Sequence, residues 1–83
     1  MNIYVKINKK FDDEKSLKAF ATLFIDKQLA ITGIRVLDGK NGLYVMMPSR
    51  MNPNGEYQDV CFPITAKMRK DITEAVLQAY NEQ

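Results

Sequence analysis

Residues 17–26 constrain the fold more than any other segment, because they alternate like a strand yet carry apolar side chains on both faces. One face is aliphatic throughout, at positions 17, 19, 21, 23 and 25. The other carries Phe20, Thr22 and Phe24 between two charged ends. A strand of an antiparallel sheet with one face in water would be polar on that face. We therefore expect the second face to be covered, either by a helix or by another subunit.

The rest of the first 62 residues is typical of further strands and short turns. Strands are expected at residues 2–8, 29–37 and 43–47, with a short fifth strand at 57–62. Residues 26–28 and 38–42 are expected to form tight turns, and residues 49–57 a loop with a tight turn at 52–55. Gly33, inside the third strand, predicts a bulge or a close backbone approach.

The last element is expected to be a helix that begins after Thr65, a residue type favoured at the N-cap. Apolar side chains recur at helical spacing along one stripe. The stripe consists of Met68, Ile72, Ala75, Val76, Ala79 and Tyr80. The order of elements predicts an α+β fold: a small antiparallel meander sheet of four to five strands followed by a C-terminal helix, in one domain over residues 1–83.

Composition excludes most catalytic and metal chemistry. The 83 residues include no His and a single Cys, Cys61, so no imidazole base, intrachain disulfide or Cys-rich zinc site is possible. The acidic run Asp12, Asp13 and Glu14 lies in a charged loop and is interpreted as a solvated turn. We therefore expect no enzyme activity, no catalytic residue, no cofactor, no metal site and no small-molecule substrate.

Two further features concern location and assembly. No stretch approaches the roughly 18 apolar residues that a membrane helix needs, and the N-terminus does not resemble a signal peptide. We therefore expect a cytoplasmic protein with no membrane partner. A chain of 83 residues buries little surface on its own. We therefore expect a homodimer, in which a second copy buries further surface.

The start of the helix departs from the usual charge pattern. Lys67, Arg69 and Lys70 place three cations in the first turn and a half, where acidic residues are normally favoured. A helix N-terminus with cations around it is suited to phosphate. Alternatively, Lys67 and Lys70 pair with acidic residues one turn later. Arg50 would join the cations if its loop folds near the helix start.

The chain resembles the SpoVG family of small bacterial proteins. Residues 34–50 read IRVLDGKNGLYVMMPSR, against a family pattern of I-R-V-x-D/E-G-x-x-G-L-F-V-x-M-P-S-K/R. The match continues through Pro53, Gly55 and Tyr57 to the basic helix start, and covers about residues 20–81. The N-terminal strand matches the family poorly. Many members also continue in a polar tail beyond the position of Tyr80, so a shorter copy is expected to bind with lower affinity or different preference.

The resemblance implies a non-enzymatic, homodimeric regulator that binds DNA or RNA and influences septation, sporulation or gene expression. It also implies nucleic-acid contact by Arg50, Lys67, Arg69 and Lys70, the positions that match the family's basic loop and helix start. The alternative is a protein-interaction module in cell-division or sporulation control with no direct nucleic-acid role. The net charge of +2 is modest and favours this second hypothesis slightly.

Overall fold

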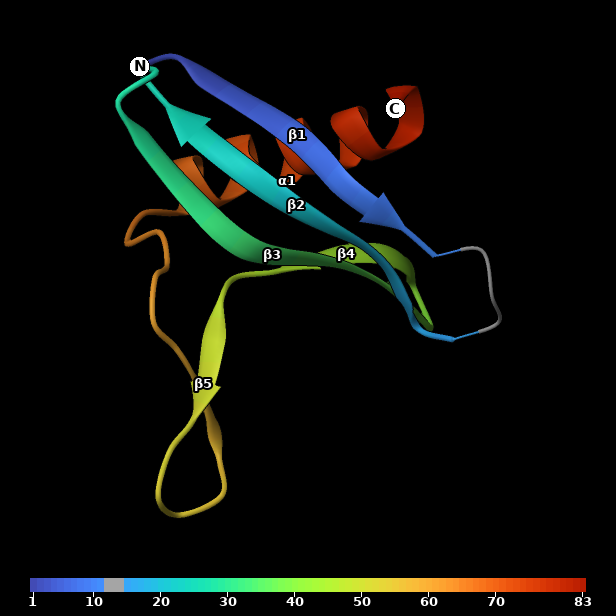
Figure 1. Cartoon of the computed structure of the whole chain (residues 1–83), viewed down its shortest axis with the longest axis vertical. Helices are drawn as coiled ribbons and strands as arrows, with labels where there is room; N and C mark the ends of the chain where they lie inside the picture. The colour runs from blue at the N-terminus through green and yellow to red at the C-terminus, as the bar shows by residue number, and fades with distance from the viewer. Residues whose placement is uncertain (12–14) are drawn as a thin grey trace.

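The computed structural model describes residues 1–11 and 15–83, so the expectation for Asp12, Asp13 and Glu14 lies outside the described residues. The fold is the predicted α+β arrangement (Figure 1). Four antiparallel strands form one sheet in chain order: β1 (Ile3–Lys10), β2 (Leu17–Ile25), β3 (Leu29–Gly39) and β4 (Gly42–Met46). A separate hairpin, β5 (Ser49–Met51) and β6 (Tyr57–Asp59), precedes the helix α1 (Ala66–Glu82).

The predicted turn between β2 and β3 is confirmed. Asp26 and Lys27 have φ values of 53° and 58°, and the Gln28 N–H donates to the Ile25 carbonyl oxygen at 3.0 Å. Positive φ at both central residues matches the right-handed twist of the flanking strands. The Asp26 carboxylate also accepts the Asn2 N–H at 2.7 Å, which ties the start of β1 to this turn.

The predicted irregularity at Gly33 is a β-bulge. Ala21 pairs with Ile34 and Leu23 with Ile31, so two residues of β3 lie opposite Thr22 alone. Gly33 has a φ of 81°, a conformation that costs glycine little and other residues more. The bulge keeps Ile31 and Ile34 on the same face of the sheet, toward the core.

The helix covers the face of the sheet that carries the aliphatic side chains of residues 17–26, and not the second face, for which a helix was one of the two expected covers. Leu23, Ile34, Val36 and Val76 are the largest fully buried side chains. They belong to a core built from the sheet and α1. Ile72, Val76 and Ala79 are the buried residues of the helix and lie on the predicted apolar stripe. The packing of α1 against β1, β2 and β4 therefore explains one of the two apolar faces of β2.

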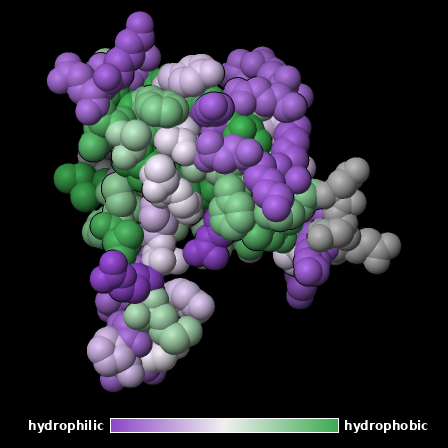
Figure 2. Space-filling model, in the orientation of Figure 1, coloured by the Kyte–Doolittle hydropathy of each residue, from purple (hydrophilic) through white to green (hydrophobic). Residues whose placement is uncertain are grey.

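The opposite face of β2 has no helix over it (Figure 1). Thr22 is only 7% exposed there, and its hydroxyl donates to the Asn8 amide oxygen at 2.7 Å. Phe20 packs edge-on against Phe11 with ring centroids 5.6 Å apart. Figure 2 looks onto this side and shows apolar and weakly polar side chains on the left of the sheet, with hydrophilic ones across its upper right part. Neighbouring side chains cover this face only in part.

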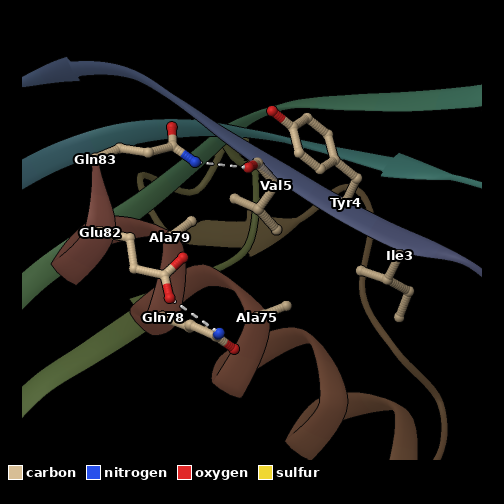
Figure 3. A pocket seen from close by; sticks show the side chains of 8 residues that line it. All are labelled: Ile3, Tyr4, Val5, Ala75, Gln78, Ala79, Glu82 and Gln83. Carbon is tan, nitrogen blue, oxygen red and sulfur yellow. Dashed lines mark hydrogen bonds between the residues drawn. The ribbon is translucent and has the colours of Figure 1, made fainter.

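The middle of the β1 edge is occupied by a side chain. The Gln83 amide donates from Nε2 to the Val5 carbonyl oxygen at 3.2 Å (Figure 3). The same amide accepts the Ile7 N–H at 2.9 Å. These two backbone groups point away from β2, where a further strand would otherwise pair. The amide also closes one end of a shallow pocket between β1 and α1, which Ala75 and Ala79 line from below.

The expectation of a loop over residues 49–57 is wrong at its start, where β5 forms. Met51 pairs with Tyr57, and the turn between them includes a bond of 3.0 Å from the Gly55 N–H to the Asn52 carbonyl oxygen. The Asn52 side chain also accepts the N–H groups of Asn54 and Glu56. β6 is shorter than the predicted strand over 57–62. These strands of three residues are too short to give an alternating apolar pattern.

Residues 49–64, here called the hairpin arm, project from the sheet and lead into α1 (Figure 1). Five large apolar side chains of the arm are exposed, and Ile64 reaches 88%. They are Met51, Tyr57, Val60, Phe62 and Ile64. Cys61, also in the arm, is partly buried. For a segment of this length, the arm exposes a large amount of apolar surface to solvent.

Candidate nucleic-acid interface

The start of α1 has the cap that the sequence predicts. Thr65 is in the extended region, at φ −125° and ψ 152°, and its hydroxyl oxygen accepts the Met68 N–H at 3.1 Å. One of the first N–H groups of the helix is thereby satisfied, and the others point outward along the axis. No acidic residue lies in the first turn. The partial positive charge of the helix end therefore adds to that of the nearby cations.

Two of the three predicted cations are paired within the helix. Lys67 Nζ lies 3.6 Å from Asp71 Oδ2, and Lys70 Nζ lies 4.0 Å from Glu74 Oε1. The Lys67 side chain is nevertheless 89% exposed, and all four groups face solvent. Exposed pairs at this helical spacing contribute only about 0.3–0.5 kcal/mol. The pairing predicted as an alternative is therefore present, in a form that a phosphate can displace.

Arg69 is on a different side of the helix. Each residue advances an α-helix by about 100°, so Arg69 is rotated about 200° from Lys67. Its side chain is exposed and has no ion-pair or hydrogen-bond partner among residues 1–11 and 15–83. The three cations consequently surround the end of the helix and do not form a single stripe. Such a ring suits an anion placed over the helix axis.

Arg50 lies on β5, opposite Gln58, and is exposed. Figure 1 places β5 on the projecting hairpin arm, apart from the first turn of α1. The structure therefore does not bring Arg50 together with the helix-start cations within one chain. Arg35 anchors the root of the arm, because its Nη2 donates to the Ser49 hydroxyl at 2.9 Å.

A further surface was not identified from the sequence. Tyr4 and Phe24 are paired across β1 and β2, and with Asn2 and Lys27 they line a hollow of about 480 Å³. The alternation of residues 2–8 places Tyr4 on the outer face. Its partner depends on the register of β1 against β2, which no sequence pattern specifies here. Only the fold brings these four residues together.

Residues 1–11 and 15–83 contain no group of three or more His, Cys, Asp or Glu side chains placed to hold a metal ion. Among the same residues, no helix has the length and apolar character needed to cross a membrane.

Comparison with known proteins gives a consistent result over nearly the whole chain. The SpoVG family model matches residues 1–82, so the N-terminal strand, expected to match the family poorly, lies within the matched range. A protein of Desulforudis audaxviator is 42% identical over 79 residues, which are 95% of this chain and 89% of the relative. One of Macrococcus caseolyticus is 41% identical over 78 residues, which are 94% of this chain and 67% of the relative.

A third relative, from Heliobacterium modesticaldum, is 42% identical over 74 residues, which are 89% of this chain and 83% of the relative. All three bear the name "Putative septation protein SpoVG". Identity near 40% over nearly the full chain, together with the family match, is decisive. The chain belongs to the SpoVG family.

Proposed function

We propose that this protein is a cytoplasmic, homodimeric regulator that binds DNA or RNA and influences septation, sporulation or gene expression. In this proposal the phosphates bind at the start of α1 through Lys67, Arg69 and Lys70, and Arg50 adds a contact from the hairpin arm. The observation that carries the proposal is the capped helix N-terminus with three exposed cations and no acid in its first turn. The septation role rests on the names of the relatives.

The weak ion pairs along α1 are compatible with phosphate binding. On binding, Lys67 and Lys70 would each leave one exposed carboxylate partner and contact a phosphate of the nucleic acid instead. Release of the counterions condensed on the nucleic acid makes this exchange favourable at low salt. The salt dependence of affinity is therefore the primary test. Fluorescence anisotropy would use a labelled 20-bp duplex and a labelled 20-nucleotide RNA between 50 and 200 mM salt. On the duplex, the six helix-start contacts of a dimer should give a slope of about −5, and the Arg50 contacts of both copies should bring it to about −7.

Neutralising the acidic partners of the two lysines should increase the affinity for nucleic acid. Changing Asp71→Asn together with Glu74→Gln should raise the affinity for the duplex about 3- to 10-fold at 50 mM salt, because both lysines become free for phosphates. A matched control, Asp38→Asn with Glu56→Gln, changes the net charge by the same amount at exposed sites away from α1. The control should change the affinity less than twofold. Equal gains from the two pairs would contradict a site at the helix start.

The proposed homodimer is supported by the hairpin arm. A two-stranded hairpin with three-residue strands is marginal in water without further packing. Its exposed apolar side chains, with those of a second copy, would form a shared interface.

Sedimentation velocity should therefore detect a dimer in the wild-type protein, and Phe62→Ser with Ile64→Ser should shift it to monomer. Leu29→Ser, an exposed apolar residue outside the arm, is the control and should leave the dimer intact. A monomeric wild-type protein would contradict the dimer.

The same exposed arm favours the second candidate function, a protein-interaction module in cell-division or sporulation control with no direct nucleic-acid role. The two functions differ in the salt titration. Absence of binding to both the duplex and the RNA at 50 mM salt would leave only the interaction module.

A further inference from the structure

The hollow beside Tyr4 lies on the face of the sheet away from α1, at the end where β1 begins and β2 ends (Figure 1). Figure 3 shows the Tyr4 ring on the opposite side of β1 from Ile3, whose side chain points toward the helix. The Tyr4 side chain is 57% exposed, although it belongs to a regular strand pair. An exposed aromatic ring held by a sheet is a surface on which another planar ring can lie.

We propose that this aromatic hollow receives a base of single-stranded nucleic acid. The inference rests on the proposed function and adds to it a second contact, specific to unpaired bases. In single-strand-binding proteins, aromatic side chains on a sheet stack the bases while nearby cations contact the backbone. A duplex hides the faces of its bases, so this hollow would not contribute to duplex binding.

The geometry of the two rings leaves room for a base. Tyr4 and Phe24 are direct cross-strand partners, with ring centroids 6.0 Å apart and ring planes tilted by 34°. The rings therefore do not stack face to face on each other, and ring surface remains available for a third ring. The register of β1 and β2 holds both side chains in place, so little conformational entropy is lost when a base binds.

The polar groups around the hollow suit a nucleotide. Lys27 stands on its wall, in the turn with φ 58°. Lys6 follows Tyr4 by two residues on β1, which places it on the same face, and it is exposed. The side-chain amide of Asn2 has no hydrogen-bond partner among the described residues and lines the same hollow. Two cations for phosphate and one amide for a base edge thus surround the aromatic pair.

A second copy of the chain is a poorer occupant for this hollow. In a two-fold interface the same surface meets itself, so Lys6 and Lys27 of both copies would be brought toward each other. The apolar hairpin arm offers a surface without that concentration of charge.

The test compares two ligands and matched tyrosine variants. Anisotropy would be measured at 50 mM salt with labelled rU12 and with the labelled 20-bp duplex. Tyr4→Leu keeps an apolar side chain but removes the ring, and should weaken rU12 binding about tenfold or more with less than a twofold effect on the duplex. Tyr4→Phe should restore rU12 binding. Tyr44→Leu removes another exposed tyrosine, outside the hollow, and should leave both ligands unchanged.

A second measurement reports stacking directly. A 2-aminopurine placed in the middle of rU12 loses fluorescence when it stacks, and this quenching should be present with wild type and absent with Tyr4→Leu. Unchanged rU12 affinity and quenching in Tyr4→Leu would overturn the inference while duplex binding kept the proposed function intact. An equal loss on both ligands, or conversion of the dimer to monomer by Tyr4→Leu, would also overturn it. Failure of wild type to bind either ligand would instead overturn the proposed function.

Discussion

Replacing Lys67, Arg69 and Lys70 with alanine together should weaken duplex binding about 100-fold or more at 50 mM salt. Each protomer loses three cations at the helix start, so a dimer loses six. Because each phosphate contact contributes roughly −0.9 to the slope of log affinity against log salt, the slope should become less negative by about 5. The measurement is the anisotropy titration on the 20-bp duplex across 50–200 mM salt.

The same variant should fold at least as well as wild type. Cations at a helix N-terminus each cost about 0.3–1 kcal/mol through the helix dipole. The two exposed ion pairs that are lost contribute about 0.3–0.5 kcal/mol each. Removing the cations should gain at least as much free energy as losing the ion pairs costs. We therefore expect an unchanged or slightly raised Tm, measured by circular dichroism. Loss of binding without loss of stability would separate a binding role from a structural one.

A charge-matched control guards against a general effect of lower net charge. Lys6→Gln, Lys27→Asn and Lys40→Gln remove three exposed cations from the sheet and its turns. Asn is chosen at position 27 because it tolerates positive φ. On the duplex this triple should weaken binding less than tenfold. A loss as large as that of the helix-start triple would contradict the assignment of Lys67, Arg69 and Lys70.

Leu23→Ala should cost about 2–5 kcal/mol of unfolding free energy. Leu23 is fully buried in β2, paired with Val5 on one side and Ile31 on the other, beneath α1. Removing its branched end opens a cavity at the centre of the core, which the surrounding strands cannot close. With about 0.05–0.15 kcal/mol of stability per residue, the whole domain has about 4–12 kcal/mol, so the loss would be a substantial part of its total. Urea unfolding followed by circular dichroism would measure the loss.

Leu29→Ala is the matched control for this prediction. The residue type and the change are the same, but Leu29 is 55% exposed at the start of β3. The control should shift stability by less than about 0.5 kcal/mol. Similar losses at positions 23 and 29 would mean that the core is not centred on β2.

The elements with strong local determinants were predictable from the sequence. Thr65 caps α1 because a hydroxyl at that position can reach a free N–H, and the stripe through Val76 fixes which side of the helix is buried. The bulge at Gly33 was likewise indicated by an isolated glycine in a strand. Each of these depends on a few neighbouring residues. They need no knowledge of the tertiary fold.

The features that could not be predicted from the sequence depend on residues distant in the chain or on small differences in free energy. β5 is three residues long and held by Asn52, Arg35 and its partner strand, none of which gives a strand pattern. The Tyr4–Phe24 pair requires the register of β1 against β2. The choice of Lys67 between Asp71 and a ligand remained open, since the alternatives differ by a few tenths of a kcal/mol. Sequence therefore indicated a candidate cluster but not its internal pairing.

The docking of Gln83 on β1 has a consequence for how copies of the chain can associate. A sheet of order β1-β2-β3-β4 has two open edges, and two open edges allow unlimited head-to-tail strand addition, the route to fibres. The Gln83 amide occupies the Val5 carbonyl and the Ile7 N–H in the middle of one edge. A strand approaching the middle of the β1 edge would first have to displace this amide. We therefore expect strand pairing between copies to be disfavoured at the middle of β1, which hinders head-to-tail growth of this sheet.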